Sequence, residues 1–135
     1  MTMRAWTAKD IVNIPKVKQI GSLSHEVSLA LYVRIDQIFA MDQGVDKVGT
    51  AFGVELPNLS VIQKGCLTHQ TDKVILLHNH PYLDGRCDAS PSEEDLVATE
   101  FYAKHLALMG IQLLDHIIVA QDGTYFSFRA ANYLS

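Results

Sequence analysis

The organisation of this chain is clearest in residues 74–81, which read Val74-Ile75-Leu76-Leu77-His78-Asn79-His80-Pro81. The continuous apolar run from Val74 to His78 is typical of a strand with both faces covered. His80-Pro81 ends this strand, because proline cannot donate to a sheet ladder. A fully covered strand in the middle of the chain predicts a sheet with helices packed on it.

A loop, a helix and two strands are expected after this stretch. Residues 82–89 lack periodicity, and Ser90-Pro91-Ser92-Glu93 then signals a helix start, with Ser90 as the cap and Glu93 completing a capping box. The helix should end at Gly110, and its buried side should consist of the alanines with Leu96, Phe101, Leu106 and Leu108. A strand from Leu113 to Ala120 and a hairpin through Asp122-Gly123 to Tyr125–Phe128 follow.

Further strands and one helix are expected before residues 74–81. Val27 to Ile35 alternates apolar residues on odd positions, which predicts a strand with one buried face. Strands are also predicted at Gln37–Met41 and Lys47–Phe52, and a helix from Pro57 to about Thr71. In the first twenty residues only a short edge strand, Val17–Ile20, is expected. This order of elements favours an α/β three-layer sandwich built on a mixed sheet.

Composition limits the class of protein. The 135 residues and 15.0 kDa suffice for one core but not for two ordinary domains. The formal net charge is -4 and the basic residues are scattered, which argues against phosphate-driven nucleic-acid binding. No apolar run approaches the roughly 20 residues of a membrane helix, and no signal peptide is recognisable. Two cysteines, Cys66 and Cys87, suit a reducing cytosol, so we expect a soluble cytoplasmic protein.

Candidate metal ligands are concentrated in two segments. His78 and His80, at i and i+2 of a strand, project from the same side and can converge on one ion. Asp95 follows in the opening turns of the next helix and shares a helix face with Ser92. Two imidazoles and one carboxylate leave a fourth position for water, which is the pattern of a catalytic zinc site.

These segments resemble a known family. Residues 75–81, the segment Ser90-Pro91-Ser92-Glu93-Glu94-Asp95 and the segment 113–119 are similar to the JAB/MPN domain of RadC-like proteins. That domain belongs to the JAMM metalloprotease group, with an H-x-H…S-x-x-D motif and a cytidine-deaminase-like fold. The resemblance extends from about Gly21 to the C-terminus, so residues 1–20 would be an N-terminal extension or edge strand and 21–135 a single JAB/MPN domain.

The resemblance implies a mechanism. His78, His80 and Asp95 would bind Zn²⁺, Glu26 would be the general base that later protonates the leaving amine, and Ser92 would steady the oxyanion. The implied activity is hydrolysis of peptide or isopeptide bonds in a protein or peptide substrate by a metal-activated water.

The spacing departs from the family pattern. Eleven residues separate His80 from Ser92, where the family usually has seven, so we infer a four-residue insertion in the loop 81–91. Three points stay open: whether Asp84 or Asp88 replaces Asp95, whether the longer loop shields the site, and whether Cys87 reaches the metal. His116, beside Asp115, is either hydrogen-bonded to a metal ligand or a structural histidine.

Two other functions are considered. The alternative to the hydrolase is a non-catalytic JAB-fold module, with a structural metal or none, that binds a protein or a DNA-repair-associated partner. Base deamination is disfavoured, because the sequence has no P-C-x-x-C motif. The substrate is not identified by the sequence, and a homodimer through an exposed sheet edge stays open.

Overall fold

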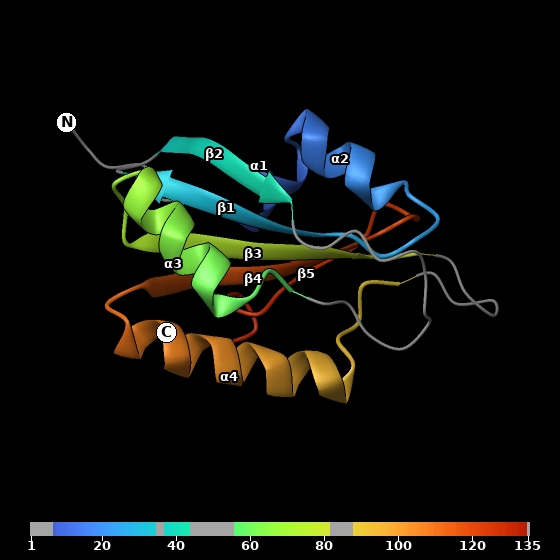
Figure 1. Ribbon diagram of the computed structural model, residues 1–135. Helices are drawn as coiled ribbons and strands as arrows, with labels where there is room; N and C mark the ends of the chain where they lie inside the picture. The colour runs from blue at the N-terminus through green and yellow to red at the C-terminus, as the bar shows by residue number, and fades with distance from the viewer. Residues whose placement is uncertain (1–6, 35–36, 44–55, 82–87, 135) are drawn as a thin grey trace.

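The computed structural model describes residues 7–34, 37–43, 56–81 and 88–134 (Figure 1). Across these residues one mixed sheet has the strand order β2-β1-β3-β4-β5. Only β3 and β4 run parallel, and the other neighbouring pairs are antiparallel. The strands are β1 (Ser28–Arg34), β2 (Gln37–Gln43), β3 (Lys73–His80), β4 (Gln112–Ala120) and β5 (Tyr125–Ser127).

Helices cover both faces of this sheet. Helices α1 (Ala8–Val12) and α2 (Pro15–Gly21) pack on one face, and α3 (Leu59–Thr68) and α4 (Glu93–Leu108) pack on the other (Figure 1). Helix α4 connects the parallel strands β3 and β4, as a crossover between parallel strands requires. The predicted α/β three-layer sandwich is therefore confirmed.

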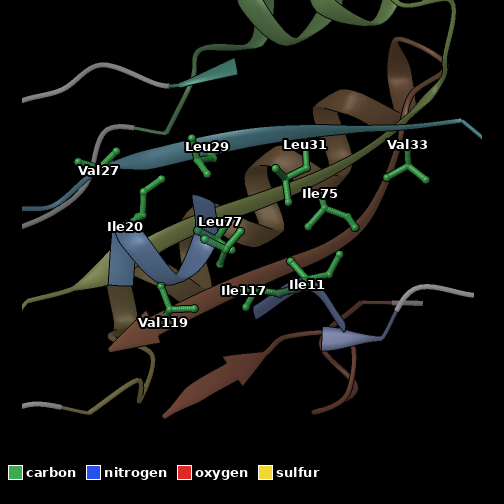
Figure 2. Close-up of a cluster of buried hydrophobic side chains, with 11 residues drawn as sticks. Ile11, Ile20, Val27, Leu29, Leu31, Val33, Ile75, Leu77, Ile117 and Val119 are labelled. Carbon is green, nitrogen blue, oxygen red and sulfur yellow. The ribbon is translucent and has the colours of Figure 1, made fainter. Parts of the chain in front are cut away.

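Strand β1 is buried on both faces, so the expectation of one buried face is wrong. Its odd residues, Leu29, Leu31 and Val33, join the cluster under α1 and α2 (Figure 2). Its even residues Ala30 and Tyr32 are fully buried in the cluster under α3 and α4. A small alanine and an amphipathic tyrosine resemble a solvated face in the sequence, yet a helix covers them here.

The expected edge strand at Val17–Ile20 is also wrong, because these residues belong to helix α2. Pro15 occupies the first turn of that helix, where its missing N–H costs nothing. Thr7 and Asp10 form a capping box that begins α1. Ile11 and Ile20 then project into the core from the two helices (Figure 2), and Val17 belongs to the same buried cluster.

Helix α4 begins two residues later than the sequence signal placed it. Its N-cap is Ser92 rather than Ser90, and Asp95 rather than Glu93 completes the capping box. The expected buried side is wrong for Phe101 and Leu108, which are 47% and 77% exposed. The buried residues of α4 are Asp95, Thr99 and Leu106. The buried face of this helix is thus partly polar, and it lies against the site described below.

The remaining predicted elements agree with the structure where it describes them. Gly110 has a φ of +77°, the left-handed conformation expected at the end of α4. The predicted strand Lys47–Phe52 lies outside the described residues. Within the described residues, no helix has the length and apolar character needed to cross a membrane.

Candidate metal centre

The histidine pair lies at the carboxyl end of β3. Val74, Leu76, His78 and His80 share one face of this strand, because side chains alternate along it. His78 is 1% exposed, and its Nε2 lies 3.3 Å from Nε2 of His80. The i, i+2 spacing therefore brings the two imidazoles together as the sequence predicted.

Asp95 approaches the histidines from the first turn of α4. Its Oδ1 lies 3.3 Å from His78 Nε2, and its Oδ2 lies 3.3 Å from His80 Nε2. The capping box orients the side chain, since the Ser92 N–H donates to Asp95 Oδ2 at 2.9 Å and the Asp95 N–H donates to Ser92 Oγ at 3.0 Å. The sequence signal for this arrangement is the spacing S-x-x-D. The same two residues cap the helix and place the Asp95 carboxylate at the histidines.

The three side chains form one candidate metal-binding group. Within the described residues, His78, His80 and Asp95 are the His, Cys, Asp or Glu side chains whose ligand atoms gather, all within 4.8 Å of one another. Two imidazole nitrogens and one carboxylate oxygen are a donor set that Zn²⁺ takes in catalytic sites. The residues present fit a metal ion, and we call them the His-His-Asp cluster.

The charges of the cluster are strongly coupled. Burial opposes a charge on Asp95, but the contacts of its carboxylate with the imidazoles of His78 and His80, and with the Ser92 N–H, outweigh burial, so the pKa of Asp95 is lowered and the carboxylate stays ionised. Burial lowers the pKa of His78. Burial acts in the same direction on His80, but the Asp95 carboxylate outweighs it and raises the His80 pKa. The cluster thus combines an ionised carboxylate with a buried imidazole that favours its neutral, ligating form.

Asn79, between the two histidines, points to the opposite face of the strand. Its Oδ1 accepts from the Val27 N–H at 2.6 Å, and its Nδ2 donates to the His25 carbonyl at 2.8 Å. These two hydrogen bonds fix the backbone on both sides of Glu26. The sequence reasoning gave Asn79 no role, although its position in the alternation of β3 places it on the face opposite the ligands.

Glu26 lies next to the cluster. Its Oε2 is buried and has no hydrogen-bond partner among the described residues. Burial raises the pKa of Glu26, and the nearby His80 lowers it in part, while Asp95 and Glu94 raise it further. A buried carboxylate oxygen without such a partner is costly unless water, a ligand or a reacting group meets it, which makes Glu26 a candidate member of the site.

His116 supports the cluster from behind. Its Nε2 lies 2.8 Å from His78 Nδ1, so the structure favours the hydrogen-bonded role that the sequence left open for it. Its Nδ1 lies 2.6 Å from Thr99 Oγ1, and that hydroxyl also donates to the Asp95 carbonyl at 2.7 Å. Thr99 was not predicted, because a lone threonine inside a helix carries no sequence signal.

The sequence of this chain matches a known protein family. A family model described as the RadC-like JAB domain matches residues 8–133. The chain belongs to the RadC-like JAB domain family. The match begins within the segment expected to be an extension, and the domain boundary at residue 21 stays a prediction.

Individual relatives match a shorter stretch of the chain. A UPF0758 protein of Porphyromonas gingivalis is 38% identical over 71 residues, which is 53% of this chain and 30% of that protein. A UPF0758 protein of Aquifex aeolicus is 46% identical over 61 residues, 45% of this chain and 24% of that protein. The matched part of the chain therefore spans less than a third of the length of these relatives.

Asp88, near the end of the loop that follows β3, lies beside the cluster. The Asp88 carbonyl lies 3.3 Å from His80 Nδ1, and the Asp88 carboxylate accepts from the Ser90 N–H. Among the described residues Asp95, not Asp88, completes the cluster, as the inferred insertion requires. Asp84 and Cys87 lie outside the described residues, so shielding of the site by the loop and the role of Cys87 stay open.

Proposed function

We propose that this RadC-like JAB domain is a zinc-dependent hydrolase of peptide or isopeptide bonds in a protein or peptide substrate. The observation that carries the proposal is the convergence of the His-His-Asp cluster beside Glu26, whose buried Oε2 meets no hydrogen-bond partner in the described part of the chain. His78, His80 and Asp95 would hold the ion. A bound zinc ion polarises a carbonyl and lowers the pKa of its water to about 7.

Glu26 is suited to moving the proton in this reaction. Its pKa is raised mainly by burial, which brings it closer to the neutral range where a general base works best. Its Oε2 makes no competing hydrogen bond to the residues that the structure describes, so it is available to take a proton from water and to return it to the leaving amine. Asn79 holds the backbone on either side of Glu26 and so fixes the side chain at the cluster.

Ser92 is suited to stabilising negative charge on the substrate carbonyl oxygen. In the capping box its Oγ accepts a hydrogen bond from Asp95, which leaves the hydroxyl proton available for donation. The side chain is exposed at the start of α4, where a substrate can reach it. A donor of this kind contributes about 2–4 kcal/mol in other enzymes.

To test this, the zinc-loaded protein is incubated with a proteome-derived peptide library and with a panel of lysine-branched isopeptides. Mass spectrometry then detects cleavage as new peptide termini. Glu26→Gln removes the base, and Glu93→Gln is the matched control, because Glu93 is an exposed acid in the first turn of α4. We expect cleavage by wild type and Glu93→Gln, and none by Glu26→Gln at unchanged zinc content.

Two results would contradict the proposal. Cleavage by Glu26→Gln at the wild-type rate would remove Glu26 from the mechanism. Zinc binding by all three proteins with cleavage by none would overturn the hydrolase and leave the JAB-fold binding module.

A further inference from the structure

A chain of three hydrogen bonds connects two members of the His-His-Asp cluster through residues that do not belong to it. The chain runs from His78 Nδ1 to His116 Nε2 at 2.8 Å, from His116 Nδ1 to Thr99 Oγ1 at 2.6 Å, and from Thr99 Oγ1 to the Asp95 carbonyl at 2.7 Å. His78, His116 and Thr99 are at most 2% exposed, so bulk water does not compete for these bonds. The chain joins β3, β4 and α4 behind the cluster.

Counting protons assigns a direction to every bond in this chain. A carbonyl has no proton, so the single hydroxyl proton of Thr99 must point at the Asp95 carbonyl. Thr99 Oγ1 can then only accept from His116, whose Nδ1 must therefore carry a proton. In a neutral ring the Nε2 of His116 is then bare, and it must accept a proton from Nδ1 of His78.

The surroundings of His116 favour the neutral ring. The side chain is fully buried and stacks on Phe128 with ring centroids 4.8 Å apart and planes 9° apart. Its two nitrogens meet an imidazole and a hydroxyl, and neither meets a carboxylate of the described residues. A buried cation without a direct counter-charge would lose its hydration with little in return.

We propose that Thr99 and His116 are positioning residues that hold the proton of His78 on Nδ1 and keep its Nε2 lone pair directed at the metal position. This inference rests on the proposed function, since it assigns a role toward the same ion. Its consequence is that the cluster is prepared before metal arrives: His78 needs neither a ring flip nor a change of tautomer to become a ligand. A histidine here takes the place of the carboxylate or carbonyl that usually supports a ligating histidine.

The first test uses a matched pair of substitutions at Thr99. Thr99→Val keeps the shape of the side chain and removes the hydroxyl, whereas Thr99→Ser keeps the hydroxyl. Zinc affinity is measured by competition with a chromogenic chelator, alongside urea unfolding of the zinc-free proteins. We expect Thr99→Val to weaken zinc binding about 10–100-fold, the range found for partners of ligating histidines elsewhere. Thr99→Ser should rescue the affinity to within about 3-fold.

The second test needs neither zinc nor a stable variant. A long-range proton–nitrogen NMR spectrum of zinc-free wild-type protein, labelled with ¹⁵N in histidine, reports which ring nitrogen carries the proton. We expect protonated Nδ1 and bare Nε2 for His116, and a protonated Nδ1 for His78. A proton on Nε2 of His116 overturns the inference.

The outcomes separate this inference from the proposed function. Zinc binding that is unchanged in Thr99→Val overturns the positioning role and leaves the metal site intact. Failure of wild type and both Thr99 variants to bind zinc overturns the metal site itself, and with it both proposals.

Discussion

Asn79 offers a direct test of how the segment carrying Glu26 is held. In Asn79→Ala the Val27 N–H loses its partner at 2.6 Å, and the His25 carbonyl loses its partner at 2.8 Å. Val27 and Asn79 are fully buried, so water cannot replace the first bond. An unsatisfied buried donor costs about 1–3 kcal/mol, and a lost hydrogen bond about 1 kcal/mol.

Together these effects predict a loss of about 2–4 kcal/mol in the free energy of unfolding, a large share of the roughly 5–15 kcal/mol typical of a domain. The measurement is urea unfolding followed by far-UV circular dichroism. Asn13→Ala is the matched control, because Asn13 also donates to a backbone carbonyl, at 2.9 Å, but on an exposed surface. It should cost less than about 0.5 kcal/mol.

Asn79→Asp provides a second comparison. The carboxylate can still accept from Val27, but its other oxygen would face the His25 carbonyl, so two acceptors would meet in a buried place. Asn79→Ala or Asn79→Asp within about 0.5 kcal/mol of wild type at pH 7 would refute the reasoning that Asn79 clamps this segment.

Three further predictions follow from buried or capped positions. Gly65→Ala should lower the free energy of unfolding by at least about 2 kcal/mol in urea, because the added Cβ would overlap the fully buried Tyr32 ring at Oη and Cζ; a gain, as helix propensity alone predicts, would contradict this packing. Ser92→Ala should cost about 1 kcal/mol by removing the cap of α4, whereas Ser92→Gly should cost a few tenths, and equal costs would argue against the cap. Burial raises the pKa of Asp115, so the folded protein keeps a proton there that the unfolded chain has released, and stability falls as pH rises from about 4 through the raised pKa. Asp115→Asn lacks this component, so its stability relative to wild type, measured by urea unfolding at several pH values, should rise over that range; a constant difference would contradict the raised pKa.

The positions of the His-His-Asp cluster could be anticipated because they depend on local periodicity. His78 and His80 converge through the two-residue period of a strand, which any extended chain imposes. The S-x-x-D spacing at a helix start predicts Asp95 as a ligand, even though the sequence signal places the N-cap at Ser90, two residues before the observed cap Ser92. Ser90 and Ser92 each lie three residues before an acidic residue, so the sequence offers two capping boxes, and the structure has the one formed by Ser92 and Asp95.

Other features depend on tertiary structure and have no comparable signal. The exposed fractions of Phe101 and Leu108 could not be predicted, because the buried face of α4 is occupied by Asp95 and Thr99 instead. Polar residues on a buried face are explained only when the partner is known, here His116 on β4.

The N-terminal helices illustrate a missed local signal instead. Thr7 and Asp10 form the same kind of capping box as Ser92 and Asp95, and Pro15 sits at a favourable helical position. Val17 and Ile20 are three residues apart, which suits one helix face better than a strand. An edge strand at Val17–Ile20 is expected only if Pro15 is treated as an interruption, whereas its place in the first turn of α2 is a helix signal.

The central claim is that His78, His80 and Asp95 hold one metal ion, and zinc content per chain tests it most directly. Protein stripped with a chelator and refilled with zinc is measured by elemental analysis for wild type, His80→Ala, Asp95→Ala and the control Asp88→Ala. We predict about one zinc in wild type and in Asp88→Ala, and loss of zinc in the other two. No zinc in wild type, or full zinc in Asp95→Ala, would contradict the account.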